Sequence, residues 1–325
     1  MSFSSDVKEE LSARLDSARH CQIAEFAALM GMSGRIRRSS GGEMQVEMLT
    51  ENEVARYKFI VLLETIFDID SSDILYISES SRDTSIRICD QKQVAKILQT
   101  LKWTDDTFEH IEPVFVDPRI VQKDCCKKSF IRGAFIAAGS ISDPNKFYHY
   151  EIVCDYEEDA ECLKDMLCFF NLDAKITQRK NSYIVYMKEG SNITDALNLM
   201  GAYVSQMDLY NVMILKEMRN DVNRKVNCET ANLNKTISAA VKQTRDIEYI
   251  RDTVGLSSLK EGLYQVAKIR LEHQDMNLKD IGELLDPPVG KSGVNHRLRK
   301  ISELADEIRE SRGETKVRSN DVVSV

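Results

Sequence analysis

The residues with the clearest chemistry lie in one short segment, LKDIGELLDPPVGKSGVNHRLRKI (278–301). Its apolar residues recur at helical spacing up to Leu285, two prolines follow, and a second helical pattern begins near Ser292, which can cap it. The second pattern carries cations and amides, and no carboxylate stands between Lys291 and Lys300. Guanidinium and amide groups recognise bases and phosphates, so the segment predicts a helix-turn-helix that binds double-stranded DNA.

The predicted DNA contacts divide according to the chemistry of each side chain. Arg297 and Arg299 can each donate two hydrogen bonds to guanine or clamp a phosphate, and Asn295 can pair with adenine. The other polar residues of this helix suit backbone contacts, and His296 suits either role. The full predicted set is Lys291, Ser292, Asn295, His296, Arg297, Arg299 and Lys300. The turn over 286–290 is longer than in the simplest motif, which leaves the register of the helix open.

Further predicted helices must hold the two helices of the helix-turn-helix in place. We expect an all-α DNA-binding domain of four or five helices over 228–310, with the helix-turn-helix at about 275–308. Three polar residues near its start are candidates for secondary phosphate contacts or for helix caps: Asn232, Asn234 and Lys235. The plainer interpretation of the basic segment is a helical hairpin with a solvated face.

The net charge of −8 is unusual for a DNA-binding protein until it is divided along the chain. Residues 220–300 hold 14 Lys and Arg against 11 Asp and Glu (+3), whereas residues 1–219 hold 26 against 35 (−9). An acidic body repels the phosphate backbone, so binding is expected from the C-terminal part. A chain of 325 residues with 42% hydrophobic and 30% charged residues is typical of a folded protein of two or three domains.

The first two thirds of the chain contain a weak internal repeat. Each repeat begins with a helix of small residues that ends in glycine, CQIAEFAALMGMSG (21–34) and CKKSFIRGAFIAAG (126–139). We expect an α+β domain over 1–218 with two α-β-β-α-β-β-α halves, about 1–105 and 120–218. The later helices of the halves are expected at 53–67, 91–101, 158–170 and 193–200. Small residues would let the two head helices pack along a pseudo-twofold axis; the alternative is two unrelated alanine-rich core helices.

Several segments carry a resemblance to known families. FAALMGMSG (26–34) and IRGAFIAAG (131–139) resemble the paired signature helices of the LAGLIDADG homing endonucleases. Nearly the whole chain resembles the WhiA family of bacterial DNA-binding proteins, in which such a domain precedes a helix-turn-helix. The most specific segments are SFSSDVKEEL (2–11), IRGAFIAAGSISDP (131–144), NCETANLNK (227–235) and LDPPVGKSGVNHRLRKI (285–301). The resemblance implies a role in cell division and chromosome segregation and, in some relatives, transcription of sporulation genes.

Catalysis by the LAGLIDADG-like domain is not expected. In the nucleases, the acidic residue beside the terminal glycine of each signature helix binds the divalent metal that phosphodiester cleavage needs. This chain has Ser33 and Ala138 at those positions, and neither side chain supplies an anionic ligand. The domain is therefore expected to be degenerate; an active endonuclease is the rival hypothesis. Arg35 and Arg37, on the following strand, are candidates for secondary DNA contacts or for charges that protect an edge strand.

No motif for a cofactor, metal or nucleophile stands out elsewhere. The sequence has no GxxxxGK[ST], GxGxxG, GxSxG or HExxH motif, and its five histidines are widely scattered. Its eight cysteines include no CxxC pair. Cys125 and Cys126 lack a partnered histidine at usable spacing, so both are expected to be structural thiols. We expect no cofactor, no metal and no small-molecule substrate.

The remaining segments complete the prediction. The N-terminus lacks an apolar signal region and no stretch has 18 uninterrupted apolar residues, so we expect no membrane partner and a cytoplasmic, nucleoid-associated protein. The polar stretch 219–227 is expected to be a linker, and 311–325 a disordered tail. The predicted function is a non-enzymatic DNA-binding regulator. A second rival is an interaction scaffold in which the acidic N-terminal domain binds another protein.

Overall fold

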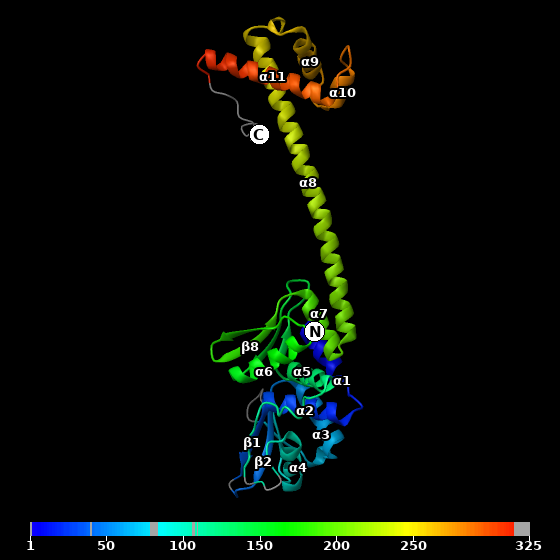
Figure 1. The fold of residues 1–325 in the computed structure, drawn as a ribbon, viewed down its shortest axis with the longest axis vertical. Coiled ribbons are helices and arrows are strands. Elements are labelled where there is room, and N and C mark those ends of the chain that lie inside the picture. Colours follow the sequence, from blue (N-terminus) through cyan, green and yellow to red (C-terminus); the bar gives the residue numbers. More distant parts are fainter. Residues whose placement is uncertain (1, 40, 79–83, 106–107, 109, 315–325) are drawn as a thin grey trace. The chain divides into compact units, whose positions relative to one another are not determined.

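The chain forms two compact units, Met1–Glu217 and Met218–Val325, each with its own hydrophobic core (Figure 1). The computed structural model describes residues 2–39, 41–78, 84–105, 108 and 110–314. None of the described helices is long and apolar enough to cross a membrane.

The N-terminal unit contains the same order of elements twice. After a first helix, α1 (Phe3–Ala13), the first half consists of α2 (Arg19–Ser33), β1 (Gly34–Arg38), β2 (Met44–Thr50), α3 (Glu53–Phe67), a 3-10 turn (Ser71–Asp73), β3 (Leu75–Ser78), β4 (Thr84–Ile88) and α4 (Gln91–Leu101). The second half consists of α5 (Asp124–Ala138), β5 (Gly139–Ile141), β6 (Tyr150–Cys154), α6 (Glu157–Phe169), β7 (Lys175–Arg179), β8 (Ser182–Met187) and α7 (Gly190–Met200). The predicted α-β-β-α-β-β-α order is confirmed in both halves.

Each half builds a four-stranded antiparallel sheet, in the orders β1-β2-β4-β3 and β5-β6-β8-β7. The registers are equivalent, because Gly34 pairs with Met48 at the start of β1 and Gly139 pairs with Ile152 at the start of β5. In each half the first strand therefore follows directly from the glycine that ends the signature helix. The order predicts two strands after each signature helix, but the position of β5 could not be predicted, since three residues are too few to display a two-residue alternation.

Helices α2 and α5 pack against each other at the centre of the unit. At Gly133 a Cβ atom would lie 2.6 Å from the carbonyl oxygen of Glu25 and 2.9 Å from the Cβ of Ala28, so only glycine permits this approach. The expectation that small residues bring the two signature helices together is confirmed. The helices are also joined by charge, because Arg132 on α5 donates to Glu25 on α2 from Nε and Nη2, each at 2.9 Å.

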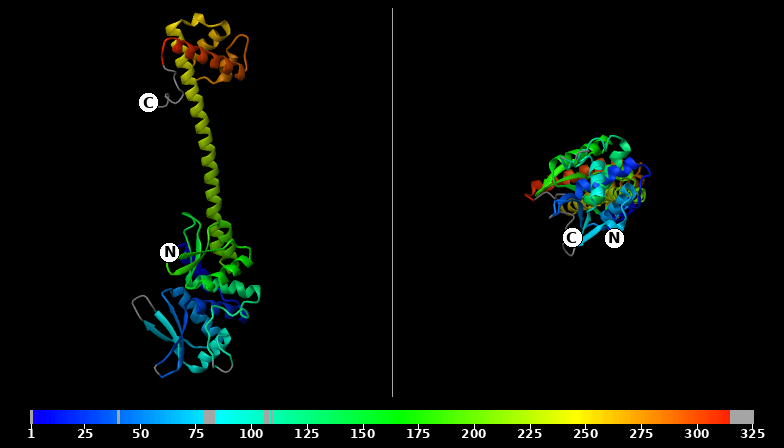
Figure 2. Two further views of the ribbon diagram at one scale, coloured as in Figure 1. Left: turned by 60° about the vertical axis from the view of Figure 1, so that its left-hand side comes forward. Right: turned by 90° about the horizontal axis from the view of Figure 1, so that it is seen from below.

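A single helix, α8 (Tyr203–Thr253, 51 residues), belongs to both units (Figure 2). Residues 219–227, predicted as a polar linker, are helical and lie within it, because neither glycine nor proline occurs between Gly201 and Gly255. In the N-terminal unit the start of α8 is capped by α1. Glu10 accepts hydrogen bonds from the backbone of Val204 (2.8 Å) and Ser205 (3.0 Å).

The described part of the C-terminal unit, up to residue 314, contains helices and no strand. After α8 it contains a 3-10 turn (Leu256–Ser258), α9 (Glu261–Glu272), α10 (Leu278–Glu283) and α11 (Lys291–Ser311). Its core joins α8, α9, α10 and α11 through Ile247, Ile250, Leu263, Val266, Ala267, Ile281, Leu285, Val294, Leu298, Ile301 and Ala305. A buried ion pair of 2.8 Å between Arg309 and Asp246 adds a polar link from α11 to α8. Helix α11 continues to Ser311, and residues 315–325 of the expected tail lie outside the described part of the chain.

Candidate DNA-binding site

A close backbone contact fixes the connection between α10 and α11. The amide of Val289 donates to the carbonyl oxygen of Gly282 at 2.9 Å. A Cβ at Gly282 would lie 2.0 Å from the carbonyl oxygen of Val289, so the connection closes against α10 only because this residue has no side chain. Asn277 caps α10 by accepting from the amides of Lys279 (2.9 Å) and Asp280 (3.1 Å). These contacts fix the end of α10 and the path of the connection to α11.

The exposed face of α11 carries most of the predicted DNA contacts. Six of the seven predicted side chains are exposed: Lys291, Ser292, Asn295, His296, Arg299 and Lys300. Starting at Ser292, steps of three, four and seven residues place Asn295, His296 and Arg299 on the same side of the helix. The expectation that Ser292 caps the helix was wrong, because the cap position is Gly290 and Ser292 lies within the first turn. We call Ser292, Asn295, His296 and Arg299 the α11 face.

Arg297 lies apart from the α11 face. It is half-buried, and its Nη1 donates to the carbonyl oxygen of Gly262 at the start of α9, at 3.3 Å. Arg299 is different, because its side chain is 75% exposed and pairs only with the exposed Glu303 one turn later, at 3.2 Å. Such a surface pair contributes little energy and can be exchanged for a phosphate or a base.

Asn295 also borders a cavity of about 720 Å³ within the C-terminal unit. Side chains from α8, from the α9–α10 connection and from α11 line it, and Lys235 is among them. The structure thus brings Lys235 and Asn295, predicted separately, to one cavity. Asn232 and Asn234 are exposed on α8 but are not among its lining residues, and Asn232 donates to the sulfur of Cys228 at 3.7 Å.

The two arginines predicted as secondary contacts belong to the N-terminal unit, on the edge strand β1. Both are exposed, but Nε of Arg37 lies 2.5 Å from Oε2 of the buried Glu47. Arg87 pairs with the same carboxylate at 2.7 Å. Burial alone would raise the pKa of Glu47, but the hydrogen bonds from Arg87 and Ser85 and the charge of Arg37 lower it. Arg37 is therefore largely neutralised, whereas Arg35 has no ion pair among those described.

The positions of the nuclease acids lie at the C-terminal ends of the signature helices. Ser33 is the last residue of α2 and Ala138 the last of α5. Among the described residues, the one group of three or more His, Cys, Asp and Glu side chains that could hold a metal ion lies elsewhere. At these ends neither Ser33 nor Ala138 supplies the carboxylate that binds the metal in the resembled nucleases.

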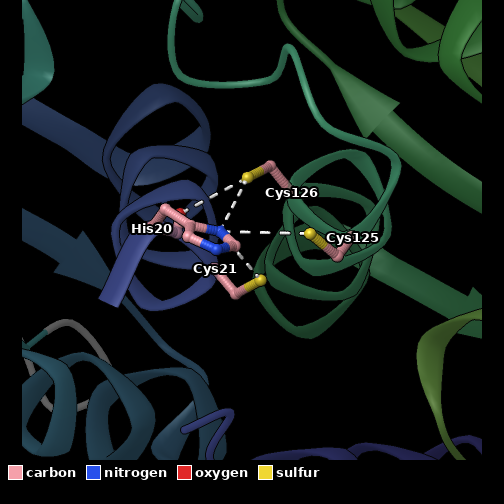
Figure 3. A group of neighbouring side chains, drawn as sticks. All are labelled: His20, Cys21, Cys125 and Cys126. Atoms are coloured by element: carbon pink, nitrogen blue, oxygen red, sulfur yellow. Dashed lines mark hydrogen bonds between the residues drawn. The ribbon is translucent and has the colours of Figure 1, made fainter. Parts of the chain in front are cut away.

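That group consists of His20, Cys21, Cys125 and Cys126, at the opposite ends of α2 and α5 (Figure 3). Cys125 and Cys126 were expected to lack a histidine partner. The partner lies 105 and 106 residues earlier in the chain, and the packing of α2 on α5 brings it within reach. The available signal was the internal repeat, which aligns His20 and Cys21 with Cys125 and Cys126.

A buried charge network beside this group was not predicted from the sequence. Glu25 lies between Arg132 and Lys58, whose Nζ is 3.2 Å from its Oε1, and Asp16 accepts from Nη2 of Arg132 at 2.5 Å. Burial alone would lower the pKa of Arg132, but Glu25 and Asp16 reverse that effect and raise it. Burial lowers the pKa of Lys58. The network joins the two halves of the N-terminal unit.

These features define the class of protein. The chain combines an α+β LAGLIDADG-like domain, with Ser33 and Ala138 in place of the nuclease acids, and a helical domain that contains a helix-turn-helix.

Comparison with known proteins identifies the family. A family model for the WhiA LAGLIDADG-like domain matches residues 127–219, and one for the WhiA C-terminal HTH domain matches residues 222–305. A protein of Lachnospira eligens named probable cell division protein WhiA is 69% identical over 314 residues, which cover 96% of this chain and 99% of that protein. Its namesake from Lachnoclostridium phytofermentans is 45% identical and covers 95% and 100% of the two chains.

A solved structure of a WhiA protein also matches this chain. The crystal structure of full-length DUF199/WhiA from Thermotoga maritima matches with a TM-score of 0.57 at 25% identity, covering 94% of this chain and 99% of that chain. The chain belongs to the WhiA family.

Proposed function

We propose that this chain is a non-enzymatic DNA-binding regulator whose α10–α11 pair binds double-stranded DNA in the major groove. The observation that supports it is the division of α11 into two sides. Val294, Leu298 and Ile301 are buried in the core of the unit, while the α11 face is exposed and has cations beside it. A helix held rigidly on one side and polar on the other is the form in which helix-turn-helix proteins read base edges.

Within this proposal the side chains divide by position. Arg299 suits guanine, Asn295 suits adenine, and His296 suits a base or a phosphate. Lys291, Ser292 and Lys300 suit phosphates, as do the first amides of α11, because Gly290 leaves them without a side-chain cap. Arg297 holds α11 against α9, and it supports DNA binding indirectly because it fixes the position of α11. Lys235 flanks the site, and Asn232, Asn234 and Arg35 are weaker candidates for phosphate contacts.

The N-terminal unit, in the same proposal, is a nuclease scaffold without activity that offers an acidic surface to a protein partner. The names of the relatives support a role in cell division. Chromosome segregation, the transcription of sporulation genes and a nucleoid-associated location in the cytoplasm are the roles that the family resemblance adds. No small-molecule substrate or membrane partner is part of the proposal.

Binding to DNA is tested by selecting the preferred site from a random duplex library and measuring affinity across a salt series. Asn295→Ala and Arg299→Ala are expected to cost about 1–3 kcal/mol each and to relax the preference at one base position. Arg251→Ala is the control, because it removes the same charge from an exposed arginine paired with Asp252 on α8. Equal losses in all three variants, or a salt slope near zero, would contradict base reading by the α11 face.

The absence of nuclease activity has its own test. Purified protein is incubated with magnesium or manganese and the selected DNA, and the products are resolved on a gel. We expect intact DNA. Reproducible cleavage at a defined position would overturn the non-enzymatic assignment and support the endonuclease rival. If a strain that carries both Asn295→Ala and Arg299→Ala divides normally, the hypothesis of an interaction scaffold is favoured instead.

A further inference from the structure

The group of His20, Cys21, Cys125 and Cys126 has the symmetry of the domain. His20 and Cys21 are the second and third residues of α2, and Cys125 and Cys126 are the second and third residues of α5. The two helices have equal lengths and pack together at the centre of the unit. The pseudo-twofold relation therefore brings two adjacent pairs of side chains face to face, and each pair supplies two metal-ligating atoms.

The four ligating atoms surround one point. They all lie within 4.8 Å of one another. Nδ1 of His20 lies 3.2 Å from the sulfur of Cys126, 3.3 Å from that of Cys21 and 3.9 Å from that of Cys125. For a tetrahedral zinc ion with bonds of about 2.3 Å to sulfur and about 2.0 Å to nitrogen, neighbouring nitrogen and sulfur atoms are about 3.5 Å apart. Figure 3 shows the three sulfurs grouped around the imidazole.

We propose that His20, Cys21, Cys125 and Cys126 bind one zinc ion, which joins the N-terminal ends of α2 and α5. Three thiolates and one imidazole are ligands for zinc, whereas magnesium and calcium prefer oxygen. Four protein ligands leave no open position, so the site is structural. It lies about 20 Å along the helices from Ser33 and Ala138, given a rise of about 1.5 Å per residue.

Hydrogen bonding alone explains the arrangement poorly. An unprotonated Nδ1 has a single lone pair in the ring plane and cannot accept well from three thiols. Cys126 has an alternative acceptor in the carbonyl oxygen of His20, at 3.7 Å, but this leaves Cys21 and Cys125 converging on one nitrogen. A disulfide would use two of the three sulfurs and would give the histidine no role. A shared cation explains all four side chains together.

The surroundings suit a site with three thiolates. With zinc and a neutral histidine the site carries a net charge of −1, which needs nearby positive groups. Neither α2 nor α5 has a side-chain N-cap, so the first amides of both helices are left to favour negative charge at the site. Lys128 lines the same cavity of about 520 Å³ as Cys21 and Cys125. His20 and Cys125 are exposed, which gives an ion access.

Zinc binding is measured on the full chain without a histidine tag, kept reduced and free of oxygen. After reconstitution with zinc and gel filtration, elemental analysis is expected to find one zinc ion per chain. Replacement by cobalt is expected to give the visible bands and the sulfur-to-metal charge-transfer absorption of a tetrahedral thiolate site. Less than a stoichiometric amount of zinc, or octahedral cobalt, would overturn the proposal.

Two exposed ligands provide variants that leave the core intact. Cys125→Ser and His20→Ala each remove a direct zinc ligand. Loss of a partner that only contacts a ligand weakens metal binding by roughly 10–100-fold, so both variants are expected to weaken zinc binding by more than that. Cys168→Ser is the matched control, because Cys168 is an exposed free cysteine of the same unit outside the group. Zinc should raise the unfolding temperature of the wild type and this control, but of neither ligand variant. Equal zinc affinity in all variants, or a disulfide among the three cysteines of the reconstituted protein, would refute the site.

Discussion

Glu25 is the residue on which the centre of the N-terminal unit most depends. Its side chain is fully buried between Arg132 and Lys58, and it is the anion that both of these buried cations share. Asp16 partly compensates Arg132 but is more exposed. A buried charge that loses its partner destabilises a protein far more than an exposed one does, because water cannot replace the missing interaction.

Glu25→Gln keeps the shape of the side chain and removes its charge. We expect the variant to lose about 3–5 kcal/mol of unfolding free energy. Urea unfolding followed by the fluorescence of Trp103 measures the loss, because this buried residue of the same unit is the chain's single tryptophan. Glu53→Gln is the matched control; its carboxylate is 86% exposed beside Arg56, and a change below about 1 kcal/mol is expected. Similar losses of unfolding free energy in both variants would show that the buried network contributes no more to stability than an exposed ion pair does.

The residues proposed to bind DNA were predicted on one helix, but their separate positions were not. The types and spacing of the polar residues predict that Arg297 and Arg299 act alike. The difference between them arises from the packing of α11 on α9, where Arg297 meets the backbone of Gly262. Likewise, the four metal-ligating residues could not be recognised as a group from the sequence. Cys125 and Cys126 lie about a hundred residues after His20 and Cys21.

At the scale of elements, Gly282 decides whether α10 and α11 can form the pair. The carbonyl oxygen of Val289 occupies the space that a Cβ at this position would need. No rotation of a side chain relieves that clash, since both partners are backbone atoms. A larger residue must move the connection away from α10 and tilt the start of α11.

Gly282→Ala is therefore expected to destabilise the C-terminal unit by about 1–3 kcal/mol and to weaken DNA binding at least tenfold. Thermal unfolding by circular dichroism and DNA titration check the two effects. Gly41→Ala is the control, because Gly41 lies in the connection between β1 and β2 and a Cβ there would meet only Oγ of Ser39, at 3.7 Å. Normal DNA affinity in Gly282→Ala would show that the register of α11 does not depend on this contact.

Helical periodicity predicted the elements well where a strong pattern ends at a clear signal. The expected helices at 53–67 and 91–101 coincide with α3 and α4, which begin after the caps Asn52 and Asp90. The continuity of α8 was not predicted, because residues 219–227 were interpreted from their polar composition as a linker, although Val222 and Val226 keep a helical spacing within them. The repeat and its small residues predicted the pairing of α2 and α5, since two helices can approach closely only where glycine and alanine lie at the contact.

At the scale of the molecule, two paired carboxyl groups, Asp16 and Glu47, make the stability of the N-terminal unit depend on acid. Burial alone would raise the pKa of Asp16, but hydrogen bonds from Arg132 and Ser129 and the charge of Arg132 lower it. The pKa of Glu47 is lowered in the same way by Arg87. A carboxyl group whose folded pKa is depressed contributes stability above its unfolded value, about 4, and this stability is lost as the pH falls through the folded value.

We expect the unfolding free energy reported by Trp103 to be nearly constant from neutral pH to about pH 5.5 and to fall below about pH 5. Urea titrations at successive pH values measure this dependence. Asp16→Asn should lower the stability at neutral pH and flatten the acid slope, because the group that takes up the proton is gone. An unchanged slope in this variant would contradict the assignment. Asp68→Asn, which alters an exposed acid at the C-terminal end of α3, is the control.

The cap that Glu10 provides at the start of α8 has a consequence for synthesis. The carboxylate and its backbone partners are separated by 194 residues. At about 5–20 residues per second, the ribosome completes α1 roughly 10–40 s before Val204 is made. The α5 partner of the first half is made within that interval, but the end that α1 must cap appears only when it closes. The N-terminal unit therefore reaches its final form late in translation.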